Sequence, residues 1–317
     1  MQVAGENIDR VMNLEIRRPG PRAGIKWPLY TIARGKLNES MVLAAARRLD
    51  CAPCNIGIVS GAAVPERMPN GENDGPFGSV VLSRALLAVG HRPTIYTDPE
   101  CAESFRVLLH RYELDVPVVN LILGDTAGQE DIASREDQLI AIERLGGNTN
   151  GHLYGVTGVS RSAHRANVDH LFRTATTLGK PTLGIGDGGN EVGFGNVHAE
   201  LWSECGQHAM ADTTPCAGGI FSVVETDVLV VASTSNLGAY GVVAALALLR
   251  EEPALCHCPQ DELSLHDIGI ELGLTDGSTG RVLPWCDGVP SECSAAIVQI
   301  MQGIVEQSMQ LAAPRGF

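Results

Sequence analysis

Residues 184–195 form a glycine-rich stretch that reads GIGDGGNEVGFG. Six of its twelve residues are glycine, and they surround Asp187, Asn190 and Glu191. Glycine has no Cβ, so the backbone here can approach a ligand closely and adopt a positive φ. The stretch overlaps a short apolar run at 181–186, which we predict to be a strand. Its polar side chains would then converge at the carboxyl end of that strand, where α/β sheets bind ligands.

On both sides of this stretch, short β-branched runs alternate with helical patterns along the chain. This alternation is typical of a parallel sheet with helices on its faces. The predicted strands are 55–60, 93–97, 117–123, 138–142, 181–186 and 227–232. They are mostly apolar on both faces, which favours a buried parallel sheet. The predicted fold class is therefore α/β: a mostly parallel, Rossmann-like sheet with helices on both faces, in three layers.

Apolar residues with a 3.6-residue period predict a helix at about 166–178 and another around 297–305. The predicted organisation is an N-terminal segment, residues 1–40, followed by one α/β domain, residues 41–317. The stretch 251–260 has the composition of a linker before a C-terminal segment. Two long polar loops, 61–73 and 146–161, are where we expect substrate contacts.

Composition limits the class of partner. The chain has 317 residues, 44% of them hydrophobic and 19% charged, so it can bury a substantial core. Its formal net charge of −14 argues against nucleic acid, because neutralising phosphates requires clustered Lys and Arg. No apolar run approaches the roughly 18 residues of a membrane span, and the first residues do not resemble a secretory signal. We predict a cytoplasmic protein with a small-molecule partner; a homo-oligomer is left open.

The glycine-rich stretch also fits a dinucleotide fingerprint, since residues 184–189 read G-x-G-x-x-G. Its place late in the chain is wrong for that fingerprint, and Asp187 would repel a pyrophosphate. The acidic and amide oxygens of this stretch are instead ligands that suit Mg²⁺ or Mn²⁺. The structural alternative is a glycine-rich turn in which Asp187 or Asn190 caps the next helix.

Two further polar stretches follow predicted strands. Residues 72–79 come after the strand that ends in Ser60 and Gly61, and Asp74 there either caps a helix or lies where a helix start binds a substrate carboxylate. Residues 233–241 contain Ser235 and Asn236, which either bind a carboxylate or cap the helix that begins there.

One Glu-Arg pair closes the strand at 138–142, so Glu143 and Arg144 would lie at the carboxyl edge of the sheet. Arg144 either pairs with a substrate carboxylate or forms a structural ion pair with Glu143 or another acid. The sequence alone leaves both interpretations open.

Nine cysteines are too few and too scattered for a disulfide framework, so we expect reduced thiols. The motifs Cys51-x-x-Cys54 and Cys256-His257-Cys258 do not belong to a properly spaced set of four zinc ligands. Cys51-x-x-Cys54 also precedes a strand instead of opening a helix as redox motifs do. The sequence therefore predicts neither a zinc nor a redox site.

Taken together, these blocks resemble the D-glutamate cyclase-like family. The resemblance rests on residues 184–193 (GIGDGGNEVG), 57–61 (GIVSG), 73–78 (NDGPFG), Glu143-Arg144, 235–240 (SNLGAY), Asp276-Gly277 and Asp287-Gly288, in family order. It implies a lyase that converts D-glutamate, or a related small amino acid, to 5-oxoproline with loss of water, assisted by Mn²⁺ or Mg²⁺.

Closing this lactam requires a base for the amine proton and polarisation of a carboxylate. Asp187 and Glu191 are the predicted metal ligands, and Glu191 or Asp74 is the predicted general base. Arg144 and the helix start at Asn236 are predicted to hold the substrate α-carboxylate. The other predicted substrate-binding residues are Asn190, Gly188, Gly189, Glu143, Ser235, Ser60 and Gly61. The alternative function is a non-catalytic protein that binds a small carboxylate at the same glycine-rich loop.

Overall fold

A computed structural model describes residues 1–17 and 23–310 of the chain. Its centre is a six-stranded sheet with the strand order β3-β2-β1-β4-β5-β6, and every neighbouring pair is parallel. The strands are β1 (Asn55–Ser60), β2 (Arg92–Thr97), β3 (Val118–Asn120), β4 (Gln138–Ile142), β5 (Thr182–Gly186) and β6 (Val228–Val231). A separate antiparallel pair joins β7 (Trp285–Cys286) to β8 (Val289–Pro290).

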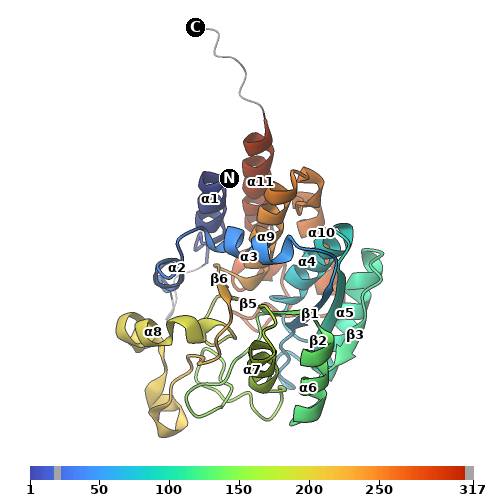
Figure 1. Ribbon diagram of the computed structural model, residues 1–317. Helices are drawn as coiled ribbons and strands as arrows, with labels where there is room; N and C mark the ends of the chain where they lie inside the picture. Colours follow the sequence, from blue (N-terminus) through green and yellow to red (C-terminus); the bar gives the residue numbers. More distant parts are fainter. Residues whose placement is uncertain (18–22, 311–317) are drawn as a thin grey trace.

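Helices cover both faces of the sheet (Figure 1). They are α1 (Gln2–Met12), α2 (Lys26–Arg34), α3 (Met41–Leu49), α4 (Pro76–Ala88), α5 (Pro99–Arg111), α6 (Thr126–Arg135), α7 (Asp169–Thr177), α8 (His198–Cys205), α9 (Ser235–Arg250), α10 (Pro259–Glu271) and α11 (Ser291–Met309). Short 3₁₀ helices are η1 (Phe194–Val197), η2 (Gly206–His208), η3 (Ala211–Thr213), η4 (Pro215–Ala217) and η5 (Pro253–Leu255).

Alternation along the strands builds two hydrophobic cores, one on each face. In β1, Ile58 belongs to the core that contains α4 and α9, whereas its neighbour Val59 belongs to the core that contains α6 and α7. Successive side chains of a strand point to opposite faces, so one strand serves both cores. The predicted α/β fold with helices on both faces is confirmed.

The strand order reverses between β1 and β4. The chain adds β2 and β3 on one side of β1, then returns and adds β4, β5 and β6 on the other side. Such a reversal leaves a crevice at the carboxyl ends of the two central strands, which is where open α/β sheets bind ligands. The topology therefore draws attention to the segments that follow β1, β4 and β5.

Several predicted boundaries differ from the observed ones. The strand predicted at 117–123 is the three-residue edge strand β3, after which Ile122 is 64% exposed. The helix predicted from 166 begins at Asp169, and the Ala166 and Asn167 carbonyls accept from the side chains of Arg144 (2.6 Å) and Gln129 (2.8 Å). The linker predicted at 251–260 contains η5, with Leu255 buried against the core.

Helix α1 takes part in the main core. Ile8 and Met12 of α1 are fully buried and belong to the same core as α9. A Cβ on Gly241 of α9 would lie 2.7 Å from Met12 Sδ, so a glycine is required at this close approach. Asp9 accepts hydrogen bonds from the Met41 and Val42 N–H groups (2.8 and 3.1 Å), which ties α1 to the start of α3.

Among the residues that the structure describes, no helix combines the length and the apolar character needed to cross a bilayer.

We expect the replacement Ile8→Ala to lower the free energy of unfolding by about 2–5 kcal/mol, because it opens a cavity where α1 meets α9. The control is Val3→Ala on the same helix, where the side chain is 74% exposed and the change should stay within about 0.5 kcal/mol. Urea denaturation measures both. Equal, small effects would mean that α1 does not contribute to the core.

Candidate active site

Three carboxylates from different connections meet at the carboxyl edge of the sheet. Asp74 lies in the segment after β1, while Glu143 and Asp187 directly follow β4 and β5. One carboxylate oxygen from each lies within 4.8 Å of the other two. Asp74 is 3% and Asp187 5% exposed, so the cluster is removed from most of the solvent. The structure thus brings together three of the predicted site residues.

The glycine-rich loop is closed by its own glutamate. Glu191 Oε1 accepts from the Gly188 N–H (2.8 Å) and the Asp187 N–H (3.2 Å), which folds the loop back on itself. Gly189 has φ +93°, a conformation that other residues adopt only with strain. Glu191 therefore holds the shape of the loop, and it is not among the three acids whose oxygens meet.

Asn190 carries an acceptor that no hydrogen bond satisfies. Its Nδ2 donates to the Tyr154 carbonyl (2.8 Å), but its Oδ1 has no partner although the residue is 3% exposed. A Cβ on Gly188 would lie 2.6 Å from this oxygen, so glycine leaves it uncovered. A buried acceptor without a donor favours a bound group that donates a hydrogen bond.

Lys26 and Asp287 complete the cluster, and the sequence did not predict either. Lys26, at the start of α2, is 2% exposed; its Nζ pairs with the Asp187 carboxylate and donates to the Asp187 carbonyl (2.8 Å). Asp287 Oδ2 lies 3.5 Å from the same Nζ, and its side chain is 22% exposed. A single lysine carries no sequence signal, whereas Asp287 belongs to a block of the family resemblance to which no role was assigned.

Burial and mutual repulsion raise the pKa values of these acids. Burial, followed by the Asp287 charge, raises the pKa of Asp74 to about 7. Burial also raises the pKa of Glu72 to about 8, with the charge of Asp74 adding to it. The pKa values of Glu143 and Asp187 lie well above the usual range, mainly through burial and then through Asp187 and Asp287, respectively. A cation in the cluster would relieve this repulsion.

Asp74 caps α9 and not the helix that follows it in sequence. Its Oδ1 accepts from the Asn236 N–H (2.8 Å) and its Oδ2 from the Ser235 N–H (3.0 Å). The N-cap of α4 is Gly75, so of the two interpretations that the sequence leaves open for Asp74, a cap of that helix does not match the structure. The start of α9, predicted to hold a substrate carboxylate, already binds the carboxylate of Asp74.

The side chains of Ser235 and Asn236 have different partners. Ser235 Oγ donates to Glu143 Oε2 (2.5 Å) and so belongs to the cluster. Asn236 Oδ1 accepts from the Gly75 and Gly78 N–H groups (2.9 and 2.7 Å), which joins α9 to the start of α4. Asn236 therefore acts on the acid cluster indirectly, because it fixes the starts of α4 and α9 relative to each other.

Arg144 lies in a buried ion pair. It is 0% exposed, and its two terminal nitrogens reach the two carboxylate oxygens of Asp98 (2.5 and 3.0 Å). The same nitrogens donate to the Gly61 and Ala166 carbonyls (3.1 and 2.6 Å). Of the two interpretations left open by the sequence, the geometry matches the structural ion pair.

Ser60 and Gly61 end β1 beside the cluster. Ser60 is 0% exposed and its Oγ has no hydrogen-bond partner. A Cβ on Gly75 would lie 2.7 Å from this hydroxyl, so the backbone next to Asp74 passes directly over it. Gly61 has φ +97° and turns the chain away from the strand.

A divalent cation fits the donors of the cluster. Asp74, Glu143 and Asp187 offer hard oxygen ligands that converge, and their raised pKa values indicate an excess of negative charge. The predicted pairing of Asp187 with Glu191 as metal ligands stays a prediction; the carboxylate oxygens that converge on Asp187 within 4.8 Å are those of Asp74 and Glu143. Glu143 also has φ 51°, an unusual conformation for a non-glycine residue and one that concentrates at functional sites.

Comparison with known proteins now adds the family. The profile described as D-glutamate cyclase-like, C-terminal matches residues 30–302 of this chain. The chain belongs to this family. A human relative, "D-glutamate cyclase, mitochondrial", is 28% identical over a match that covers 57% of this chain and 30% of the human protein. The match thus spans less than a third of that relative's length.

Solved structures are similar only at a low level. A short-chain dehydrogenase/reductase from Serratia marcescens matches with a TM-score of 0.28 at 12% identity, over 81% of this chain and 93% of that one. A UDP-GlcNAc 2-epimerase from Neisseria meningitidis matches with a TM-score of 0.28 at 9% identity, over 80% and 69%. Likenesses of this size do not extend to function.

The ion pair of Arg144 yields a stability prediction. Asp98→Asn should lower the free energy of unfolding by about 3–5 kcal/mol, because it leaves a buried guanidinium without its counter-charge. The surface pair Arg111–Glu271, 51% and 59% exposed, provides the control, and Glu271→Gln should cost no more than about 1 kcal/mol. If urea denaturation finds equally small losses of unfolding free energy for both variants, the ion pair of Arg144 with Asp98 does not stabilise the fold.

The raised pKa values predict how cation binding depends on pH. Acids with raised pKa values are protonated at low pH, and the fold then bears no repulsion between them. As pH rises through their pKa values in the folded protein, about 7 for Asp74 and about 8 for Glu72, they ionise and the fold loses stability. A bound cation opposes the loss, so Mn²⁺ should raise the melting temperature more at pH 8 than at pH 5. Asp187→Asn should reduce the shift, while Asp131→Asn on the exposed surface of α6 should not. A shift independent of pH would contradict the role of the acids.

Proposed function

We propose that the chain is a hydro-lyase of the D-glutamate cyclase type. The reaction closes D-glutamate, or a related small amino acid, to 5-oxoproline and releases one molecule of water. The observation that carries this proposal is the meeting of Asp74, Glu143 and Asp187 within 4.8 Å at the reversal point of a parallel sheet, in a chain of the D-glutamate cyclase-like family. The substrate and the reaction are taken from that family.

The chemistry sets three tasks for the site. The substrate ammonium must lose a proton so that its nitrogen can attack the γ-carboxyl carbon. The C–N bond then forms while a C–O bond of the carboxylate breaks, and the departing oxygen leaves as water after protonation. Because ring closure is intramolecular, holding the chain curled with nitrogen about 3–3.5 Å from that carbon supplies much of the advantage.

Asp74 is our choice for the base. A base works best when its pKa lies near the working pH, and burial places the pKa of Asp74 at about 7. Three backbone N–H groups, those of Gly75, Ser235 and Asn236, hold its carboxylate in one orientation. This fixed geometry suits proton transfer at a defined atom.

Lys26 and Asn190 are our choices for substrate recognition. The Lys26 ammonium is a buried positive charge, and a substrate carboxylate beside it would gain a charge-assisted hydrogen bond. The unpartnered Asn190 Oδ1 would accept from the substrate amine. Arg144 and the Asn236 N–H are engaged within the protein. Lys26 is engaged with Asp187, but it lies at the acid cluster, so a substrate carboxylate beside the cluster would share its positive charge.

Glu143 and Asp187 are the residues that would hold Mn²⁺ or Mg²⁺, with the neighbouring Asp74 carboxylate left to act as the base. The chemistry that such an ion supplies when bound is polarisation of a carboxyl oxygen. The protein's own part is to keep the acids close together: Ser235 Oγ fixes Glu143, and Lys26 holds Asp187.

The test is a product assay. Purified protein incubated with D-glutamate and Mn²⁺ should form 5-oxoproline, detected by NMR, and Asp187→Asn should reduce the rate by at least about 100-fold, a loss typical of removing a charge-stabilising group. Asp131→Asn, a matched change on the exposed face of α6, should retain the wild-type rate.

The assay also separates the alternative function. A protein that only binds small carboxylates would be stabilised by D-glutamate in a thermal-shift experiment and would leave it unaltered. Absence of product with both enantiomers of glutamate would remove glutamate as the substrate.

A further inference from the structure

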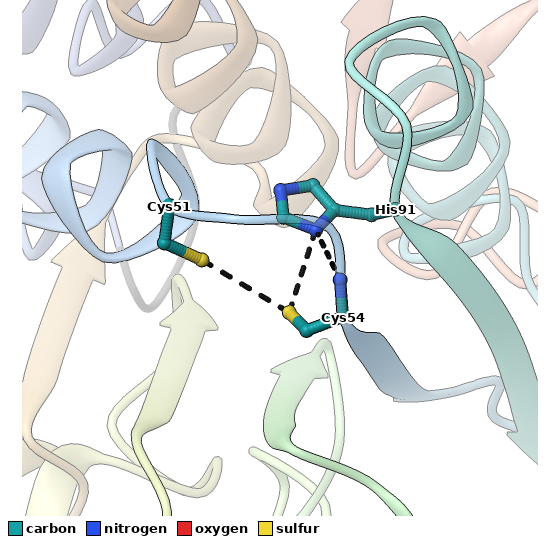
Figure 2. Close-up of side chains that lie close together, drawn as sticks. All are labelled: Cys51, Cys54 and His91. Atoms are coloured by element: carbon teal, nitrogen blue, oxygen red, sulfur yellow. Dashed lines mark hydrogen bonds between the residues drawn. The ribbon is translucent and has the colours of Figure 1, made fainter.

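A second group of side chains that could hold a metal ion lies at the amino ends of the strands, opposite the acid cluster. Cys51 and Cys54 lie in the connection from α3 to β1, and His91 lies in the connection from α4 to β2. Figure 2 shows the two thiols and the imidazole ring pointing toward one another. β1, six residues long, separates this group from the acids by about 20 Å, so the two sites share no ligand.

The distances are those of ligands around one zinc ion. Cys51 Sγ and Cys54 Sγ are 4.0 Å apart, and Cys54 Sγ is 3.4 Å from His91 Nδ1. In a tetrahedral site with Zn–S of about 2.3 Å and Zn–N of about 2.0–2.1 Å, the corresponding separations are about 3.8 and about 3.6 Å. These two distances need to change by only a few tenths of an ångström. The third, from Cys51 Sγ to His91 Nδ1, is within 4.8 Å, so the exposed Cys51 side chain would move by up to about 1 Å to complete the site.

The histidine is held in the tautomer that a metal ligand requires. Its Nε2 lies 2.8 Å from the Leu49 carbonyl oxygen, which can only accept, so Nε2 carries the proton and Nδ1 presents its lone pair. A ligating histidine typically donates its second N–H to a carbonyl or carboxylate in this way. Nδ1 currently accepts from the Cys54 N–H (3.2 Å), a bond that metal coordination would replace.

Gln138 supplies a second layer around the sulfur atoms. Its Nε2 donates to the Arg48 carbonyl (3.0 Å), which fixes the orientation of the amide. The same nitrogen lies 3.3 Å from Cys51 Sγ and 3.7 Å from Cys54 Sγ, so its second N–H can donate to one thiolate or be shared between the two. The Arg48 and Leu49 carbonyls belong to the last turn of α3, whose partial negative charge also favours a cation nearby.

We propose that Cys51, Cys54 and His91 bind one Zn²⁺ ion at the amino edge of the sheet, with the fourth position open to water. Soft thiolate and imidazole ligands select zinc over the Mg²⁺ or Mn²⁺ that suits carboxylates. Cys51 is exposed and His91 is 2% exposed, so the ion can enter from solution and still be anchored in the fold. The ion would tie the start of β1 to the start of β2.

The exchange balances in charge and atoms. Two thiol protons leave to solvent, the imidazole stays neutral, and Zn²⁺ with two thiolates carries no net charge. No oxidant or reductant is needed. A catalytic redox pair is less well supported, since such a pair opens a helix, whereas Cys51 and Cys54 lie between the end of α3 and the start of β1.

The experiment uses the full chain, reduced and stripped of metal with a chelator. Co²⁺ is added up to one equivalent, and the thiolate-to-cobalt charge-transfer absorption in the near ultraviolet is recorded. We expect this band in the wild type and its loss on addition of Zn²⁺, which binds thiolate sites more tightly. Carboxylates give no such band, so the acid cluster cannot imitate it.

Single variants assign the band to its ligands. Cys51→Ser and Cys54→Ser should abolish it, and Gln138→Leu should weaken Zn²⁺ binding by about 10–100-fold. Cys293→Ser on α11 and Asp187→Asn at the acid cluster should leave it intact. Because Cys51 is exposed, its serine variant is expected to fold even if a change at Cys54 disturbs the core.

Two results would overturn the proposal. One is the absence of the thiolate band in wild-type protein whose thiols are shown to be reduced by titration with a thiol reagent. The other is a band that persists in both Cys51→Ser and Cys54→Ser. Neither result depends on whether the chain forms 5-oxoproline.

Discussion

Like charges repel one another at the carboxyl ends of the central strands, and neighbouring groups must offset this repulsion. Asp74, Glu143 and Asp187 meet within 4.8 Å, and burial of like charges is costly unless partners compensate. Compensation comes from three separate elements: the backbone of α9 for Asp74, the Ser235 hydroxyl for Glu143 and the Lys26 ammonium for Asp187. The cluster therefore forms only when α2, α9 and the sheet are assembled together.

The sheet makes this meeting possible through its topology. Reversal of the strand order between β1 and β4 places the segments after β1, β4 and β5 along one crevice. Gly75, with φ +92°, lets the chain pass over Ser60 with no room for a Cβ. Asn236 then joins the starts of α4 and α9, so the two helices that flank the crevice cannot shift independently.

Local patterns in the sequence predict the fold and the strand ends, but they do not predict pairings between distant segments. Short apolar runs are sufficient to find β1 and β4 with their observed bounds, and polar residues at strand ends point to Asp74 and Asp187. A periodic helix pattern cannot show that a backbone carbonyl accepts from a distant side chain, and α7 begins three residues later than predicted. The carbonyls just before its start at Asp169 accept from Arg144 and Gln129.

The same limit explains the residues that the sequence misses or leaves ambiguous. Arg144 and Asp98 are 46 positions apart, Lys26 and Asp187 are 161 apart, and only the fold brings each pair together. An arginine that ends a strand beside a loop is equally compatible with a substrate carboxylate and with an internal acid. Burial decides between them, because a fully buried guanidinium needs a permanent counter-charge.

The two edges of the sheet differ in chemistry in a way that keeps two cations apart. Carboxylate oxygens at the carboxyl edge suit a hard ion, whereas thiols and imidazole at the amino edge suit a soft one, so neither site would compete strongly for the other's metal. An ion at Cys54 is too far from Asp187 to polarise a substrate. Its effect would pass through β1, which begins beside Cys54 and ends at Ser60, where the backbone of the acid cluster packs against it. Fixing the amino end of this strand would therefore restrict the position of its carboxyl end, and with it the close approach that the three acids require.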